Sequence, residues 1–399
     1  MSPRRPRRVL LSLFGSAGDL LPLLRLAIDL KQAGNDVRMA VTRSLSLYTR
    51  TFGIAAVPLG IGAEMRVFSD PEILTCRFNG WASWRRLMNG YIAPTLKSDV
   101  AMLSTVVESW RPDVVVAGSF SVAGRIIAQK LGLALVEFSI YPQHVRAAAA
   151  SSSGRIAREL RTIVGALLNA QPHDARVTRA IWAAEDTFLL HDPKLLGDGH
   201  AHCHPVIGFP YWDGVFLESE HARALASWTT RSSRRPTVLV TPGSFLGARQ
   251  HDVWTSVVRD AQSIGARVVL AGPRSEAHAA ELGAPAHEVL AVGAAPLSGA
   301  LTHVDAVVHH GGIGTTFASI RAGRPAVVIP QAFDQSENGQ LLERAGAGMT
   351  ADRMGVRDAL VRVLDDPSFA KASSELRSSL LCDERARRRM SEEVLARTS

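Results

Sequence analysis

The sequence has few cysteines, few aromatic residues and no long apolar run. Its three cysteines, Cys76, Cys203 and Cys382, are an odd number without a repeating spacing, which argues against a disulfide framework and favours a reducing compartment. No run approaches the roughly 18 apolar residues of a membrane span. The apolar stretch after the basic residues Arg4 to Arg8 is too short for a secretion signal. We therefore expect a cytoplasmic protein without a transmembrane helix.

Length and charge restrict the class of protein only loosely. The 399 residues, 46% of them hydrophobic and 21% charged, suffice for about two domains of roughly 100 to 200 residues each. The net charge of +8 favours an anionic partner, which charge alone does not identify as a phosphate ligand, a nucleic acid or a membrane surface. We expect no nucleic-acid partner and leave peripheral membrane association open.

Short β-branched runs alternate with helical stretches in both halves of the chain. Strands are predicted at 9–14, 36–42, 113–117 and 134–139, and again at 237–241, 267–271, 289–292, 306–309 and 326–329. Helices are predicted between them, and one charged helix at 373–397. This βαβ order predicts an α/β protein with two Rossmann-like, doubly wound parallel-sheet lobes facing a cleft.

A stretch rich in Pro, Gly, Ser and Arg separates the two strand series. It predicts an N-terminal domain at 1–207, a linker at 208–234 and a C-terminal domain at 235–399, with the last helix packing back on the N-terminal domain.

A glycine-rich turn, His310-Gly-Gly-Ile-Gly314, joins the strand at 306–309 to a predicted helix that begins at Thr315. Backbone N–H groups, the partial positive charge of the helix start and the Thr315 hydroxyl together favour a phosphate. His310 would reach the same phosphate with a ring N–H or as an imidazolium. The turn has neither GxGxxG nor P-loop spacing. His309 and His310 are neighbours on a strand and point to opposite faces, so they do not form a metal pair.

The next predicted strand, 326–329, leads to Asp334 and Gln335. A carboxylate and an amide are suited to the hydroxyls of a sugar. A phosphate site beside a polyol site indicates a nucleotide sugar as ligand.

Residues 295–348 resemble the donor-binding signature of family 1 glycosyltransferases, which have the GT-B fold; residues 14–37 and 208–214 resemble the same enzymes. The likeness is greatest to bacterial transferases for antibiotics, sterols and lipids, including the rhamnosyltransferase chain of rhamnolipid synthesis. It implies a diphosphate site of His310, Gly312, Gly314, Thr315 and Ser244, although Ser244 is also typical of a turn. It also implies that Asp334 and Gln335 hold the donor sugar. Backbone groups near Ala295 would read the base, without separating uracil from thymine, because Ala294 replaces an aromatic residue common in the family.

Many relatives place a histidine base in the loop after the first strand, backed by an aspartate from a later strand end. Here that loop reads Gly15-Ser16-Ala-Gly18-Asp19, and the later strand ends at Gly118-Ser119. The resemblance implies Asp19 as the base, with Ser16 orienting it or the acceptor. The alternative is that Asp19 caps a helix beginning at Leu20; a partly solvated carboxylate would then keep a pKa near ~4 and be a weak base.

Aromatic residues are few but gather before residue 92. Phe78, Trp81, Trp84 and Tyr91 predict an apolar acceptor pocket, the alternative being a small core under a loop. The histidines of the segment at 191–204 match no standard zinc spacing. We therefore expect no metal and no cofactor.

These residues predict an inverting, metal-independent glycosyltransferase, a monomer or homodimer. It would move a hexose or deoxyhexose from a UDP- or TDP-sugar to a hydroxyl of a hydrophobic small molecule. Two alternatives stay open: a nucleotide-sugar epimerase or hydrolase of the same fold, and a non-catalytic partner subunit of another transferase.

Overall fold

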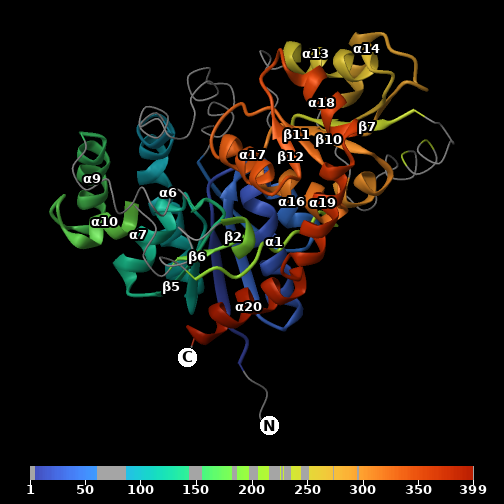
Figure 1. Ribbon diagram of the computed structural model, residues 1–399. Coiled ribbons are helices and arrows are strands. Elements are labelled where there is room, and N and C mark those ends of the chain that lie inside the picture. Colours follow the sequence, from blue (N-terminus) through green and yellow to red (C-terminus); the bar gives the residue numbers. More distant parts are fainter. Residues whose placement is uncertain are drawn as a thin grey trace. The chain divides into compact units, whose positions relative to one another are not determined.

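The computed structural model describes residues 5–60, 87–142, 155–181, 187–196, 205–214, 225, 228, 235–243, 251–272, 274–293 and 296–398. The chain divides into two compact units (Figure 1). The described part of the first unit ends at Trp212 and resumes at Leu381, and the second unit takes the chain between Asp213 and Leu380. The first unit is therefore built from both ends of the sequence.

The first unit contains a six-stranded parallel sheet. In spatial order its strands are β3 (Ala55–Leu59), β2 (Asp36–Thr42), β1 (Arg8–Ser12), β4 (Val114–Ala117), β5 (Ala134–Ser139) and β6 (Phe188–Leu189). Val9 of β1 lies between Val37 and Val114, and all three side chains are buried. Such continuous burial is typical of central parallel strands covered on both faces.

The first unit also contains helices from distant parts of the sequence. They are α1 (Ala17–Gln32), α2 (Ser46–Thr51), α6 (Ala93–Trp110), α7 (Val122–Leu131), α9 (Arg155–Leu168), α10 (Ala175–Ile181), α11 (Pro193–Leu196) and α20 (Asp383–Ala396). The last helix, α20, packs on α1 (Figure 1). There Arg387 donates two hydrogen bonds to the Asp29 carboxylate, at 3.0 and 3.3 Å.

The second unit repeats the same strand order. Its strands are β12 (Gly348–Thr350), β11 (Ala326–Val328), β10 (Ala306–His309), β7 (Thr237–Thr241), β8 (Arg267–Leu270) and β9 (Val289–Ala291), all parallel. Numbered within each unit, both sheets have the order 3-2-1-4-5-6, which is the doubly wound dinucleotide-binding arrangement. The prediction of two Rossmann-like sheets is confirmed.

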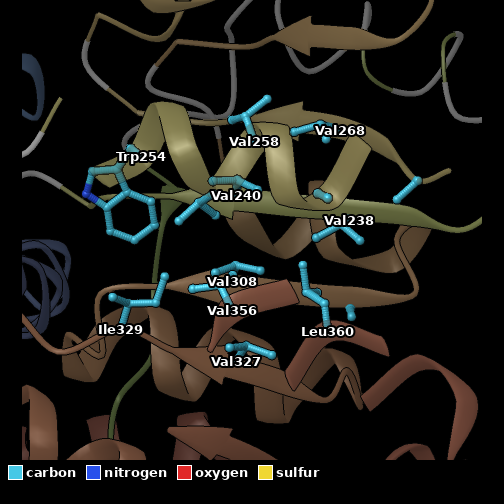
Figure 2. Close-up of a cluster of buried hydrophobic side chains, with 14 of the residues drawn as sticks. Val238, Val240, Trp254, Val258, Val268, Val308, Val327, Ile329, Val356 and Leu360 are labelled. Carbon is cyan, nitrogen blue, oxygen red and sulfur yellow. The ribbon is translucent and has the colours of Figure 1, made fainter. Parts of the chain in front are cut away.

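Helices cover this second sheet as well. They are α13 (His251–Ser263), α14 (Ser275–Leu282), α15 (Leu297–Ala300), α16 (Ile313–Ala322), α17 (Gln335–Arg344), α18 (Val356–Asp365) and α19 (Pro367–Ser379). Figure 2 shows the core between the sheet and helices α13 and α18, where strand valines meet Trp254, Val258 and Leu360. This core stabilises the second sheet, and the glycine-rich turn follows β10 at the C-terminal edge of that sheet.

The prediction of one continuous helix over 373–397 is wrong. The structure has two helices there, α19 and α20, because the backbone of Leu380 is extended at the end of α19. The N–H of Leu381 bonds instead to the Asp192 carboxylate at 2.8 Å. Among the described residues, no helix combines the length and apolar character that crossing a membrane requires.

Candidate functional site

In the second unit, His309 directly precedes the glycine-rich turn and helps to hold its shape. His309 ends β10 and is fully buried. Its Nδ1 accepts a hydrogen bond of 3.0 Å from the N–H of Gly311, which assigns the ring proton to Nε2. Burial, together with the neighbouring His310, lowers the pKa of His309 to about 3. His309 is therefore neutral and shapes the turn.

His310 occupies a space that two glycines leave open. A Cβ at Gly312 would lie 2.3 Å from His310 Nε2, and a Cβ at Gly243 would lie 2.2 Å from Cε1 of the same ring. Gly243 has φ +73°, a conformation that favours glycine. Its N–H bonds to the Thr241 hydroxyl at 3.1 Å, at the end of β7. Gly243 and Gly312 thus come from two strand ends and hold the imidazole between them.

The His310 ring is neutral in this structure. Burial lowers its pKa to about 4, against a smaller raising effect of a hydrogen bond to the Thr241 backbone. Within the described part of the chain, its buried Nδ1 atom has no hydrogen-bond partner. A buried ring nitrogen that has no partner in the described protein is available to a ligand. His310 would therefore act on a ligand as a hydrogen-bonding group before it acts as a charge.

The helix after the turn starts without a side-chain cap. Gly312 is the N-cap of α16, and Thr316 supplies the first N–H bonded back to it, at 3.0 Å. The N–H groups before Thr316 have no partner within the helix, and the helix dipole adds partial positive charge there. Gly314 and the nearly buried Thr315 lie in this first turn. This arrangement is suited to a phosphate.

The loop after β11 places Asp334 and Gln335 at the start of α17. Both side chains are buried, and Gln335 Oε1 accepts hydrogen bonds from the backbone N–H groups of Gln331 and Ala332, at 2.7 and 2.8 Å. That amide oxygen therefore holds the loop itself. The side-chain NH2 group of Gln335 is then the part of the amide that can bind a ligand.

Asn338 joins this loop to the glycine-rich turn, and the sequence analysis did not single it out. Its Nδ2 donates to Asp334 Oδ2 at 2.7 Å and to the carbonyl of Gly311 at 2.8 Å. The spacing of four residues between Asp334 and Asn338 on a helix is the signal that would have found it. The structure thus brings the predicted phosphate and sugar residues of this unit together.

Asp19, in the first unit, is not the N-cap residue, but its carboxylate does cap the helix, as the alternative interpretation held in part. Helix α1 begins at Ala17 with Ser16 as its N-cap, and Asp19 is the third residue of the helix. Asp19 Oδ2 accepts from the backbone N–H of Ser16 at 2.8 Å and from its hydroxyl at 3.2 Å. The two residues form a reciprocal capping box. A Cβ at Gly15, whose φ is +155°, would lie 2.3 Å from the same carboxylate oxygen.

Asp19 is not partly solvated, as that alternative supposed. Its side chain is 8% exposed and lines a pocket with Phe14, Leu23, Ser119 and Ile140. Burial raises the pKa of Asp19 to about 6, although hydrogen bonds from Ser16 and from the Tyr141 side chain lower it. A carboxyl group with a pKa near the working pH is a far better general base than an exposed aspartate.

Other predicted site residues are placed only in part. Ser244, Ala295, Phe78, Trp81 and Trp84 lie outside the described residues. Tyr91 is buried in the π-helical turn Met88–Ile92 that precedes α6.

A second pocket of the first unit lies against Ile92, the residue after Tyr91, and also against Phe14 and Asp99. Of the histidine-rich segment, His191 is described and buried. Within the described ranges, no group of three or more His, Cys, Asp or Glu side chains is placed to hold a metal ion.

The chain resembles known proteins in sequence. Residues 256–394 match a family model described as erythromycin biosynthesis protein CIII-like, C-terminal domain. Erythronolide mycarosyltransferase of Saccharopolyspora erythraea is 24% identical over 419 residues, covering 94% of this chain and 95% of that protein.

Two solved structures show the same fold across almost the whole chain. The glycotransferase of kitacinnamycin has a TM-score of 0.74 at 19% identity, covering 98% of this chain and 99% of its own. The glycosyltransferase VinC in complex with DTDP has a TM-score of 0.71 at 21% identity, with coverage of 98% and 99%.

Two doubly wound parallel sheets and the likeness to these two solved structures indicate the GT-B fold. The chain has the GT-B fold, and it resembles the family 1 glycosyltransferases of antibiotic biosynthesis.

Proposed function

We propose that this enzyme transfers a hexose or deoxyhexose from a TDP- or UDP-linked donor to a hydroxyl of a hydrophobic small molecule, with inversion at the anomeric carbon and without a metal ion. The observation that carries the proposal is the Asp19 carboxylate, buried in a pocket of mostly apolar walls with a pKa of about 6. Such a group accepts a proton from an alcohol that has entered the same apolar surroundings.

The residues of the second unit support a donor with a diphosphate. The start of α16 and the His310 ring match the phosphates, and Asp334 and Gln335 match the sugar hydroxyls. The complex of VinC with DTDP and the relative named a mycarosyltransferase favour a TDP-linked deoxysugar over a UDP-linked hexose.

The chemistry assigned to Asp19 is one proton transfer. Its carboxylate takes the proton of the acceptor hydroxyl, whose oxygen bonds to the anomeric carbon. The bond from that carbon to the diphosphate oxygen breaks, and the electron pair leaves with the diphosphate. Direct displacement inverts the anomeric configuration. The helix start and His310 stabilise the charge on the leaving group, which is the task a metal would otherwise perform.

The experiment is acceptor-dependent nucleotide release from TDP- and UDP-sugars, with a panel of hydrophobic alcohols and with EDTA present. The wild-type rate should fall as the pH drops through about 6, because Asp19 must be ionised to accept a proton. Asp19→Asn should lose about 10²-fold or more in rate, since general base catalysis contributes roughly that factor, and should keep its affinity for TDP.

The outcomes separate the alternatives. Release of nucleotide without any acceptor would indicate an epimerase or hydrolase. Failure to bind any nucleotide sugar would leave only a non-catalytic partner subunit. Activity that needs a divalent cation would contradict metal independence alone. Full activity of Asp19→Asn would remove Asp19 as the base and leave the donor assignment intact.

A further inference from the structure

A second buried carboxylate of the first unit has no part in the proposed proton transfer. Asp99 lies on α6 with its side chain 8% exposed, and it lines a pocket together with Phe14, Ile92 and Ser121. Among the described residues that line this pocket, Asp99 alone has a charged side chain, and most of the others are apolar. A carboxylate is costly in such surroundings unless hydrogen-bond donors reach it.

Two donors from the protein fix the orientation of the Asp99 carboxylate. Its Oδ1 accepts from the backbone N–H of Gly60 at 2.8 Å, and its Oδ2 accepts from the hydroxyl of Thr95 at 2.9 Å. Thr95 lies one turn earlier on α6, whereas Gly60 follows β3. A carboxylate oxygen accepts more than one hydrogen bond, so an oxygen held in this way can also receive a donor from a ligand.

A serine in the same pocket wall also presents an acceptor. Ser121 Oγ donates to Ser12 Oγ at 2.7 Å, so the hydroxyl proton of Ser121 is directed at the protein. The hydroxyl proton of Thr95 is directed at Asp99 in the same way. Asp99 and Ser121 therefore offer oxygen lone pairs to the pocket, and the group that suits them is a hydrogen-bond donor such as a hydroxyl.

Phe14 connects this pocket to the pocket of Asp19. The side chains of Phe14 and Leu13 line both pockets. The backbone of Gly60 packs against the Phe14 ring, because a Cβ at Gly60 would lie 2.9 Å from Cε2 of that ring. The hydrogen bond from Gly60 to Asp99 thus also supports the wall that the two pockets share. A hydrophobic molecule that packs on Phe14 can therefore contact both carboxylates.

We propose that Asp99 and Ser121 form a second acceptor subsite, which binds a hydroxyl of the acceptor other than the one that is glycosylated. The reacting hydroxyl lies at Asp19, and the apolar part of the acceptor packs on Phe14. This inference rests on the proposed function, because it needs Asp19 to mark the reacting hydroxyl. It narrows the acceptor class from hydrophobic alcohols to hydrophobic diols and polyols.

The test compares kcat/KM for pairs of hydrophobic alcohols that share one carbon skeleton and differ in a second hydroxyl. Rigid hydroxysteroids suit this purpose, because the spacing of their hydroxyls can be varied while the apolar surface stays the same. The wild-type enzyme should prefer the diol of at least one spacing by about 10- to 100-fold, the effect expected of a hydrogen bond to a charged group. Asp99→Asn keeps an acceptor oxygen for the N–H of Gly60 and should lose most of this preference.

Asp113→Asn is the matched control for Asp99→Asn. The Asp113 carboxylate also accepts from a backbone N–H, that of Arg8 at 2.7 Å, but it directly precedes β4 and lines neither pocket. This variant should keep the wild-type preference for the diol. Ser121→Ala decides the question if Asp99→Asn does not fold. Ser121 is the N-cap of α7 without a side-chain capping hydrogen bond, so the helix keeps its start, and the preference should fall several-fold.

The outcomes separate the inference from the function on which it rests. Equal kcat/KM for mono-alcohols and diols in the wild type would overturn the inference and leave the proposed function intact. An unchanged preference in a folded Asp99→Asn variant, even with a lower overall rate, would do the same and give Asp99 a structural role. No turnover of any alcohol would contradict the proposed function and this inference together.

Discussion

At the scale of the residue, the position of His310 depends on two glycines, because neither has a side chain to fill the space of the ring. Its ring lies where Gly243 and Gly312 would each place a Cβ, and both sit at the carboxyl edge of the second sheet. In the proposed phosphate site Gly243 is thus as important as the histidine, although it need not touch the ligand.

Gly243→Ala should therefore weaken TDP binding by about tenfold or more, since the methyl group would displace the imidazole by an ångström or so and misplace its hydrogen bond. The measurement is isothermal titration calorimetry with TDP. Gly265→Ala is the matched control: its φ is +78°, close to the +73° of Gly243, but no described atom lies within 4 Å of the added Cβ.

Both alanine variants should lose about 1 to 2 kcal/mol of unfolding free energy through the positive φ, and only Gly243→Ala should lose affinity. Equal affinity in the two variants would show that the His310 position does not matter for TDP.

The residues that the sequence predicts and those that it misses differ in a simple way. His310, Thr315 and Asp19 stand inside local motifs, so spacing and resemblance were enough to select them. Gly243 acts on His310, which lies far away in the sequence, through a steric contact. Such contacts become visible only when the strand order is known.

At the scale of the element, sequence prediction works best at the centre of each sheet. The continuous apolar runs of β1, β4, β7 and β10 were predicted within one or two residues. The strands β3, β6 and β12 were not predicted, and all three lie at sheet edges. Two of them are only two or three residues long, and β3 contains Pro58, so neither length nor propensity marks them.

Helix α17 links two loops, and this linkage can be tested. Asn338→Ala removes the hydrogen bonds to Asp334 and to the Gly311 carbonyl, so the loop after β11 is no longer tied to the glycine-rich turn. The KM for the donor sugar should rise about tenfold, with a smaller change in the Kd of TDP alone, because Asp334 is assigned to the sugar. Initial rates over a range of donor concentrations give the first value, and calorimetry gives the second.

The control for Asn338→Ala is Gln340→Ala, two residues further along the same helix and exposed. It removes a side-chain amide from α17 without touching the tie between the loops. If both variants raise KM alike, the effect belongs to the helix and not to the Asn338 hydrogen bonds.

At the scale of the whole molecule, the two units share one strand order and differ in how the chain completes them. The described part of the second unit comes from one stretch of sequence, whereas the first unit also includes the end of the chain as α20. Ala386, Met390 and Val394 form the buried face of α20, and the helix packs on α1, which carries Asp19. Helix α20 therefore supports the helix that carries Asp19, the proposed base.

Met390→Ala should lower the free energy of unfolding of the first unit by about 2 to 5 kcal/mol, the usual cost of truncating a fully buried methionine. Hydrogen exchange followed by mass spectrometry should show lost protection in peptides of α1 and α20, while peptides of α13 and α18 in the second unit keep theirs. Met354→Ala is the control, because its side chain is 88% exposed and its loss should cost almost nothing. Equal loss of protection in both units would mean that they unfold as one cooperative body and that α20 stabilises more than the unit it completes.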